Sequence, residues 1–344
     1  MLGSVNRVVF LLQVSREIFQ NVASAAENAA KVECKPLKPN VYAEDGKSLV
    51  SVVRTEDREN GIKKALQAIG GIRPAIEDLG EGYVLVKPNC NSHDPFPAST
   101  HPQTLRTILE LLLAEGLKRN QIVVGDMSGP AWLPTEATMR KNGILDVVNE
   151  FGVKASFFEK EEWLWVKPEE ALSWPEGFRI AKTVYNASRI ISLPCLKTHQ
   201  FGGVFTLTLK NSVGVINPAD RSLLHKKPGS RIAEINLAYT PDFVVLDGMR
   251  CFVSGGPAHG KEAVSGVMIA GDDRVAIDAV GVAVLKYFKA DGIKELRVKS
   301  HEQLSRAAEL GIGQLDGDMI SLKAFNLADD EKFDAMVNFV KRQL

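Results

Sequence analysis

The sequence predicts an α/β protein, with a mostly parallel sheet flanked by helices and arranged in one or two lobes. Short runs of apolar and β-branched residues alternate with longer segments whose apolar residues repeat at helical spacing. The connections between these segments are short, and no internal repeat or heptad pattern interrupts them. Strand-helix-strand units of this kind place their strands side by side and parallel, with a right-handed crossover.

The first strand-helix-strand units lie between residues 49 and 125. The helix at 102–116 begins with Pro102, which suits a first helical turn, and its leucines fall on one face. The strands on either side of it are rich in Val, Leu and Ile. In order, the predicted elements are a strand at 49–54, a helix at 61–79 that breaks at Gly70-Gly71 and Pro74, a strand at 83–87 ended by Pro88, the helix at 102–116 and a strand at 121–125.

The second half of the chain is less regular. Residues 159–178, rich in Trp, Pro and Glu, are predicted to decorate the surface, and residues 205–216 stay open between helix and strand. The other predicted helices are at 132–151, 231–238 and 272–288, the strands at 153–158, 180–185, 189–193, 242–247 and 264–270, and the chain closes with a strand at 319–322 and a helix from Asp330.

The pattern divides the chain into an N-terminal extension at 1–48, an α/β domain at 49–325 and a C-terminal helix at 326–344 that packs on it. Within the extension, residues 5–31 are predicted to form an amphipathic helix, because their apolar residues fall near helical spacing. The pattern leaves open whether this helix belongs to the core or forms a peripheral flap.

Composition excludes several classes of function. Hydrophobic residues make up 45% and charged residues 24%, typical of a soluble protein, and the 42 basic residues equal the 42 acidic ones. No global charge therefore draws the chain to nucleic acid or an anionic membrane. No run approaches the roughly 20 apolar residues of a membrane span, and the run at 8–12 is too short for a secretory signal. With four singly spaced cysteines, we expect a cytoplasmic protein.

The most informative polar segment follows the predicted buried strand at 189–193. It carries Lys197 and His199, and Lys210 and Asn211 come a short distance later inside an otherwise apolar stretch. Each of these residues alone is more simply a solvated side chain. Two lysines and a histidine so close together instead favour a site for an anionic ligand.

Other polar residues follow other predicted strands. If the sheet is parallel, Lys87 and Asn89, Asp126, Asp247 and Asp273 all lie with Lys197 at the same edge, where open α/β sheets bind ligands. The alternative is that the aspartates begin turns or cap helices.

Two further segments could contact an anion through the backbone. Thr100 and His101 precede the helix at 102–116, whose free N–H groups and dipole favour an anion, although N-capping explains them equally well. In the turn at 254–260, Gly255, Gly256 and Gly260 let amides approach a phosphate or carboxylate, and an ordinary hairpin loop is the alternative.

Metal binding is a minority hypothesis. Asp126, Asp247 and Asp273 are candidate ligands for a divalent metal, with histidines such as His101, although no HxxxH or HExxH spacing occurs. Cys90, Cys195 and Cys251 would hold an iron-sulfur cluster or a soft metal if they met, and inert buried thiols are the alternative.

The ordered motifs resemble the domain-of-unknown-function family 362, over roughly residues 49–313. The resemblance implies an α/β fold and, because some members carry ferredoxin-type [4Fe-4S] modules, a ferredoxin-type redox protein as a partner. This chain has no cysteine-rich ferredoxin segment, and it carries Cys195, Cys90 and Ser254 where the family usually has Lys, an aliphatic residue and Gly. The matching motifs are Lys87-Pro88-Asn89, Thr100-His101-Pro102, Gly125-Asp126, Pro194 to His199, Leu209-Lys210-Asn211, His225, Asp247-Gly248 and Ser254 to Gly260.

The leading hypothesis is an enzyme that acts on a small anionic molecule. Lys197 and Lys210 would hold a carboxylate or phosphate, and His199 or His225 would move a proton; a buried lysine whose pKa is lowered by desolvation is the alternative base. Lys87, Asn89 and Asn211 would help to bind and orient the ligand. The alternatives are an iron-sulfur or metal-linked redox accessory protein and a non-catalytic anion-binding protein.

Overall fold

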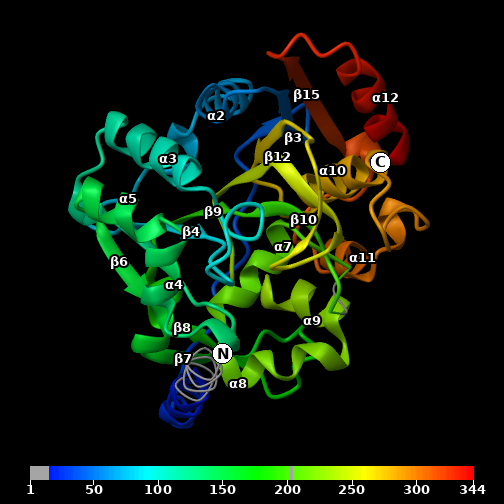
Figure 1. The fold of residues 1–344 in the computed structure, drawn as a ribbon. Coiled ribbons are helices and arrows are strands. Elements are labelled where there is room, and N and C mark those ends of the chain that lie inside the picture. Colours follow the sequence, from blue (N-terminus) through cyan, green and yellow to red (C-terminus); the bar gives the residue numbers. More distant parts are fainter. Residues whose placement is uncertain (1–14, 202–203) are drawn as a thin grey trace, which may run out of the picture.

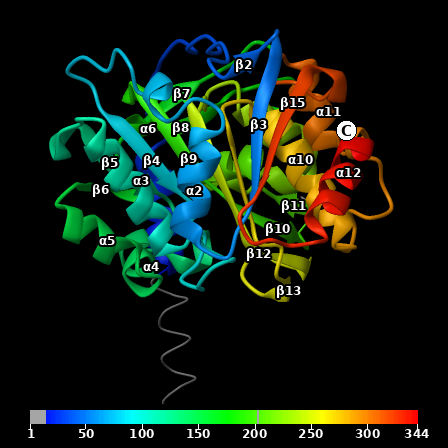
Figure 2. The same cartoon turned by 90° about the horizontal axis from the view of Figure 1, so that it is seen from above.

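The computed structural model describes residues 15–201 and 204–344. In this part of the chain a 12-stranded sheet forms the centre, with the main strand order β15-β3-β14-β12-β9-β4-β5-β6. Helices cover both of its faces, α2, α3 and α5 on one and α10, α11 and α12 on the other (Figures 1 and 2). The α/β fold predicted from the sequence is therefore confirmed.

Most predicted elements are present, with shifted ends. The strands are β1 (Ala30–Lys31), β2 (Ala43–Glu44), β3 (Lys47–Arg54), β4 (Val84–Pro88), β5 (Ile122–Asp126), β6 (Lys154–Phe157), β7 (Trp163–Val166), β8 (Phe178–Ala181), β9 (Arg189–Leu193), β10 (Cys195–His199), β11 (Val204–Thr206), β12 (Phe243–Gly255), β13 (Gly260–Ala263), β14 (Val267–Gly271) and β15 (Ile320–Asn326). The α-helices are α2 (Arg58–Gln67), α3 (Pro102–Ala114), α4 (Thr135–Lys141), α5 (Ile144–Phe151), α6 (Lys182–Asn186), α7 (Thr208–Asn211), α8 (Pro218–Arg221), α9 (Pro228–Ile235), α10 (Arg274–Tyr287), α11 (Glu302–Glu309) and α12 (Phe333–Gln343).

Successive side chains of the buried strands point into two different hydrophobic cores. In β4, Val84 and Val86 join the core that contains α2, α3 and α5, whereas Leu85 joins the core that contains α10. Because successive side chains of a strand point to opposite faces, this assignment requires helices on both sides of the sheet. The same alternation explains why these strands appear in the sequence as continuous apolar runs.

Strand direction departs from the prediction at one position. On the main path β14 runs antiparallel to both of its neighbours, β3 and β12, whereas the other neighbouring pairs are parallel. The carboxyl end of β14 therefore lies opposite the start of β12, with Gly271 paired to Val244. Asp273, which follows β14, consequently lies at the amino ends of the parallel strands, whereas Asp126 lies at their carboxyl ends.

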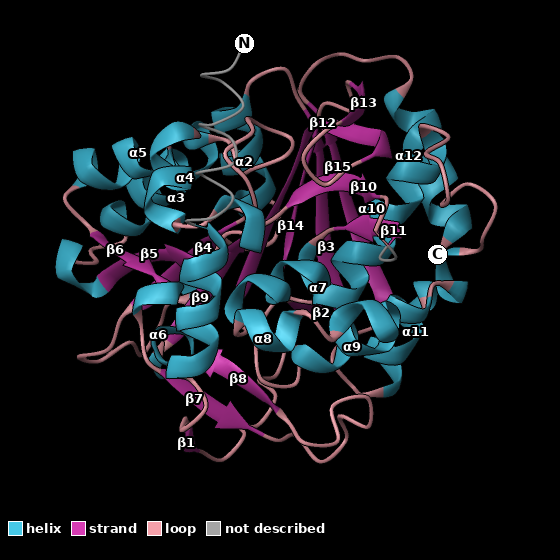
Figure 3. Cartoon of the chain, turned by 60° about the horizontal axis from the view of Figure 1, so that its bottom comes forward, coloured by secondary structure: helices cyan, strands magenta, loops and turns pink. Residues whose placement is uncertain are grey.

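Residues 159–178 are not the surface decoration that their composition suggested. They contribute β7, which pairs with β1 and β8 in a separate small sheet (Figure 3). Trp163 and Trp174 are buried there, the latter only 2% exposed. The prediction was wrong because it gave the polar residues more weight than the large apolar surface that two tryptophans can bury.

Two ambiguous stretches resolve into shorter elements. The helix predicted at 132–151 is divided into α4 and α5 by Gly143, whose φ of 80° interrupts helical geometry. Residues 205–216 contain the end of β11, all of α7 and a 3₁₀ turn at Ser212–Val215. Both the strand and the helix character of that segment were therefore present, one after the other.

The N-terminal segment packs against the body of the protein. Residues 15–25 are helical, Val22 and Ala26 are in the core, and the Ser15 hydroxyl donates to the Leu133 carbonyl at 2.8 Å. The predicted helix at 5–31 is thus observed over part of its length, and residues 5–14 lie outside the described part. Across residues 15–201 and 204–344, none of the helices combines the length and apolar character needed to cross a bilayer.

Candidate functional site

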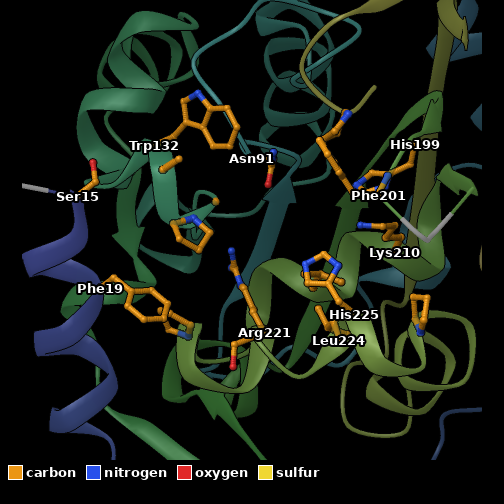
Figure 4. Close-up of a pocket in the computed structure, with 18 of the residues that line it drawn as sticks. Ser15, Phe19, Asn91, Trp132, His199, Phe201, Lys210, Arg221, Leu224 and His225 are labelled. Atoms are coloured by element: carbon orange, nitrogen blue, oxygen red, sulfur yellow. The ribbon is translucent and has the colours of Figure 1, made fainter. Parts of the chain in front are cut away.

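Two connected cavities lie beyond the carboxyl ends of β4 and β5. The inner one has a volume of about 40 Å³ and a mostly polar wall, and the outer one has a volume of about 710 Å³. An outer cavity of this size falls within the range typical of ligand pockets. Figure 4 shows Arg221 and Lys210 extending into the space between Phe19 and His199. The two cavities share Asn91, His199, Lys210, Val213, Arg221 and Pro257.

A buried ion pair forms the floor of the inner cavity. Lys87 and Asp126 end the neighbouring parallel strands β4 and β5, and Lys87 Nζ lies 2.7 Å from Asp126 Oδ1. The other carboxylate oxygen accepts the Cys90 N–H at 2.7 Å. Burial lowers the pKa of Lys87, and the neighbouring Asp126 opposes that shift. Asp126 therefore already has a cation as its partner.

Two asparagines connect this ion pair to a second lysine. Lys87 Nζ donates to Asn211 Oδ1 at 3.2 Å, and Asn89 Nδ2 donates to the same oxygen at 3.4 Å. Lys197 Nζ donates to Asn89 Oδ1 at 3.0 Å and also to the Ala98 carbonyl. Burial lowers the pKa of Lys197. Within the described residues Lys197 has no carboxylate in ion-pair contact, so its charge is met only by neutral oxygens.

Lys210 carries the least satisfied charge at the site. It lines both cavities, is partly buried, and makes no hydrogen bond or ion pair with any residue of the described chain. Burial, followed by the nearby charges of Lys197 and Arg221, lowers the pKa of Lys210 to about 7. At neutral pH this amine is therefore divided between its charged and neutral forms.

A buried carboxylate holds the short helix that carries Lys210. The two oxygens of Asp278, in α10, accept the N–H groups of Thr208 and Leu209 at 2.8 and 2.9 Å. These are the first two residues of α7, whose N–H groups have no partner within the helix. Burial raises the pKa of Asp278 to about 7. The position of Lys210 therefore depends on a carboxylate that the sequence analysis did not select.

Arg221 adds a third cation without a carboxylate partner. Its guanidinium donates to three backbone carbonyls, those of Ile216, Ser128 and Met127, at 3.2, 2.8 and 2.9 Å. Burial lowers the pKa of Arg221 to about 10, so the group stays charged at neutral pH. A guanidinium has five N–H groups, and three such bonds leave donors available to the cavity.

His199 is held as a neutral donor. Its Nδ1 accepts the Phe201 N–H at 3.1 Å, so the proton of the neutral ring lies on Nε2. Burial and the nearby Lys210 and Lys197 lower the pKa of His199 to about 2. His225 is exposed and lines only the outer cavity. The low pKa of His199 argues against it as the group that takes up a proton near neutral pH.

Three polar side chains at the inner cavity were not selected from the sequence: Arg221, Asn91 and Thr206. The Thr206 hydroxyl is in a residue only 4% exposed and has no hydrogen-bond partner, and Thr206 lies opposite Lys197 in the β10–β11 pair. Opposite residues of an antiparallel pair point to the same side, so the hydroxyl and the ammonium face the same space. Asn91 follows β4 and could have been found by extending the Lys87-Asn89 motif, whereas Arg221 and Thr206 gave no signal.

Gly214 approaches the buried ion pair too closely for any side chain. A Cβ atom at this position would lie 2.2 Å from Asp126 Oδ1 and 2.7 Å from Lys87 Nζ. We expect Gly214→Ala to destabilise the protein by about 1–3 kcal/mol, because the crowded groups must shift. Urea denaturation measures the change in the unfolding midpoint relative to the wild type. An unchanged midpoint for Gly214→Ala would contradict this close approach.

Thr100 and His101 do not line either cavity. The Thr100 hydroxyl donates to the Leu193 carbonyl at 2.6 Å and accepts the Asn89 N–H at 2.7 Å, which ties the ends of β9 and β4 together. His101 Nδ1 caps α3 by accepting the Gln103 N–H at 3.1 Å. The capping alternative therefore describes His101, and Thr100 acts on the site through Asn89.

The glycines of the late turn form a hairpin rather than a site for an anion. Gly255 pairs with Gly260 between β12 and β13, and the Gly256 N–H donates to the His259 carbonyl at 2.7 Å. A Cβ on Gly256 would lie 2.1 Å from the Thr198 carbonyl oxygen, so the turn packs directly on β10. Of this turn, only Pro257 reaches the cavities.

The three aspartates predicted as metal ligands do not converge. Asp247 accepts from Arg58 and Thr104, at 2.9 and 2.6 Å, and lies three strands from Asp126, or about 14 Å at normal strand spacing. Asp273 caps α10 by accepting the Val275 and Ala276 N–H groups. Among the described residues, no group of three His, Cys, Asp or Glu side chains is placed to hold a metal ion.

The cysteines also fit an iron-sulfur cluster poorly. Burial raises the pKa of Cys90 well above its usual value, that of Cys195 to about 12 and that of Cys251 to about 11. Among the described residues the three thiols are also not gathered with other His, Cys, Asp or Glu side chains into a group that could hold a metal ion. The inert alternative therefore describes the three thiols better.

The fold and the site define an α/β protein with a cation-lined cavity beyond the carboxyl ends of parallel strands. The chain belongs to the family described as "Domain of unknown function (DUF362)", whose profile matches residues 84–283. A thylakoid-associated protein of Synechocystis sp. is 24% identical over 251 residues, which are 69% of this chain and 74% of the relative. The lactate racemase apoprotein from Thermoanaerobacterium thermosaccharolyticum aligns over 90% of this chain and 91% of its own, with TM-score 0.38 and 12% identity.

Proposed function

We propose that this protein is an enzyme that binds a small carboxylate or phosphate in the inner cavity and carries out acid-base chemistry on it. The observation that carries the proposal is the gathering of Lys197, Lys210 and Arg221 around one small space, where no carboxylate of residues 15–201 or 204–344 forms an ion pair with any of them. Uncompensated buried cations are costly, and a bound anion removes that cost.

The polar residues of the cavity have different roles in binding and in proton transfer. Arg221 supplies fixed positive charge, Lys197 Nζ is a hydrogen-bond donor, and the Thr206 hydroxyl and His199 Nε2 supply neutral donors. Donors held in place before the ligand arrives stabilise negative charge without reorganisation. Lys210 is the residue that we assign to proton transfer, because its pKa of about 7 lets the amine gain or lose a proton near neutral pH.

This assignment revises the role that the sequence suggested for the histidines. A pKa of about 2 leaves His199 uncharged, and the exposed His225 lies in the outer cavity. In the fraction of complexes whose Lys210 amine is neutral, a fraction that grows as the pH rises, this amine takes a proton from the carbon next to the bound carboxylate, and the nearby cations stabilise the resulting enolate. Return of a proton from the Lys210 ammonium to that carbon closes the cycle and leaves the enzyme unchanged.

Binding is tested first with Lys210→Met. We expect this variant to bind butanoate or inorganic phosphate at least tenfold more weakly than the wild type, because a hydrogen bond to a charged group contributes about 1.5–3 kcal/mol. Isothermal titration calorimetry measures both dissociation constants. Lys332→Met is the matched control, since Lys332 is exposed and lies outside both cavities.

The chemical step has a separate readout. In D₂O, an enzyme of this kind exchanges the hydrogens next to the carboxylate of butanoate for deuterium, and proton NMR follows the loss of their signal. Wild type and Lys332→Met should exchange at the same rate, whereas Lys210→Met should not exchange. Binding without exchange in the wild type would leave the non-catalytic alternative, and the absence of binding would reject the whole proposal.

A further inference from the structure

The inner cavity opens into a larger space of different character. The two cavities are adjacent, because six residues line both, and Lys87 and Lys197 line the inner one alone. Around the outer part the wall is largely apolar, and it is built by residues 15–25, the 3₁₀ turn at Pro130–Trp132, the Leu224 turn and α9. The apolar side chains of that wall are Phe19, Pro130, Ala131, Trp132, Pro218, Leu224, Pro228 and Ile232.

The difference in size limits what each part can hold. A cavity of about 40 Å³ has room for only a few water-sized groups, roughly those of one carboxylate or phosphate. The outer cavity, at about 710 Å³, is large enough for the body of a metabolite. An anion as small as acetate would fill the inner part and leave the apolar wall without a partner.

The side chains are also oriented for such a division. Figure 4 places Phe19 and Trp132 on one side of the outer space, with His199 and Lys210 on the other side and Arg221 and His225 below. Phe19 and Trp132 are each only partly buried, so both rings still have apolar surface that a ligand could cover. Phe19 and Trp132 therefore lie across the outer cavity from Lys210.

We propose that the ligand is amphiphilic, with a carboxylate or phosphate head in the inner cavity and an aliphatic or aromatic body against Phe19, Trp132 and Leu224. This inference rests on the proposed function, since it uses the same inner site for the head. It adds the chemical class of the body. Each methylene that enters the apolar part raises affinity up to about fourfold until the cavity is filled.

The experiment compares probes that differ only in the body. Dissociation constants are measured by calorimetry for acetate, butanoate, hexanoate and octanoate, for butyl and octyl phosphate, and for octanol. We expect octanoate to bind at least 30-fold more tightly than acetate and octanol to bind far more weakly than octanoate. The two alkyl phosphates decide whether the head is a carboxylate or a phosphate.

Variants then test whether the higher affinity of octanoate over acetate comes from the apolar wall. Phe19→Ala and Trp132→Ala should each weaken octanoate binding about fivefold to tenfold and leave acetate binding unchanged. Leu172→Ala, which removes a side chain that is 76% exposed and outside the cavity, should change neither. Circular dichroism confirms that each variant is folded.

The outcomes separate this inference from the proposed function. If acetate or phosphate binds and octanoate gains nothing, the amphiphilic ligand is rejected while the anion site stands. If octanol binds as tightly as octanoate, the inner cations do not recognise the head, and both are rejected. If neither short nor long anions bind, the proposed function fails first.

Discussion

Replacing Asp126 by Asn is expected to lower the free energy of unfolding by about 3–5 kcal/mol, because it leaves a buried ammonium without its counter-charge. Lys87 is fully buried, and Asp126 is the only carboxylate among the described residues within ion-pair distance of its Nζ. An Asn side chain can still accept the Cys90 N–H, but its amide nitrogen would then face the Lys87 ammonium. Two donors in contact repel each other, and the ammonium loses its charged acceptor.

Urea denaturation at pH 7 measures this loss, and pH provides the internal check. Without Asp126, folding favours the neutral amine of Lys87, whereas the unfolded chain keeps it charged below pH 10. The unfolded variant then binds more protons than the folded one, so the stability of Asp126→Asn should rise with pH by up to about 1.4 kcal/mol per unit. A difference in the free energy of unfolding between variant and wild type that stays constant from pH 7 to pH 9 would show that the unpaired Lys87 ammonium does not cause the loss.

An exposed ion pair gives the matched control. Arg106 and Glu150 also form an ion pair with bidentate hydrogen bonds, but on the surface, where water replaces either partner at little cost. Glu150→Gln should leave the urea midpoint unchanged. If Asp126→Asn behaves in the same way, burial does not set the energy of the Lys87 pair.

The sequence predicted those site residues that parallel strands bring together at their carboxyl ends. Lys87, Asn89 and Asp126 follow buried apolar runs, and neighbouring parallel strands bring their carboxyl ends together. Lys197 belongs to the same set, because β10 continues β9 after Pro194. The prediction failed at Asp273, because an apolar run has the same pattern in either direction and β14 is antiparallel.

The residues that the sequence did not reveal reach the site through tertiary contacts. Arg221 comes from a short helix after an irregular segment, and Phe19 comes from the N-terminal segment. Thr206 is distinguished only by the absence of a hydrogen-bond partner, which a sequence does not encode. Such residues need coordinates, because no periodicity relates them to the strands.

The identity of the titrating group was also beyond the sequence. A histidine is the ordinary choice near neutral pH, since its unperturbed pKa is about 6.5 and that of lysine is about 10.4. Burial reverses the order here, lowering the pKa of His199 to about 2 and that of Lys210 to about 7. Desolvation depends on how the chain packs around each group, so only the folded structure shows which one changes charge.

The affinity for butanoate is consequently expected to fall with rising pH, by about fivefold to 30-fold between pH 7 and pH 9, since the charged fraction of Lys210 falls from about one half to about one hundredth and the neutral form binds only as weakly as Lys210→Met. The bound anion raises the pKa of Lys210, so binding near pH 8 takes up a proton. Affinity is therefore highest below pH 7 and decreases as the pH rises through the pKa of Lys210 in the free protein. Calorimetry in HEPES and Tris, which differ in ionisation enthalpy, measures both quantities. Lys210→Arg keeps the charge at every pH in this range and should remove the slope. If the slope persists in that variant, another group, with Lys197 the nearest candidate, controls the site.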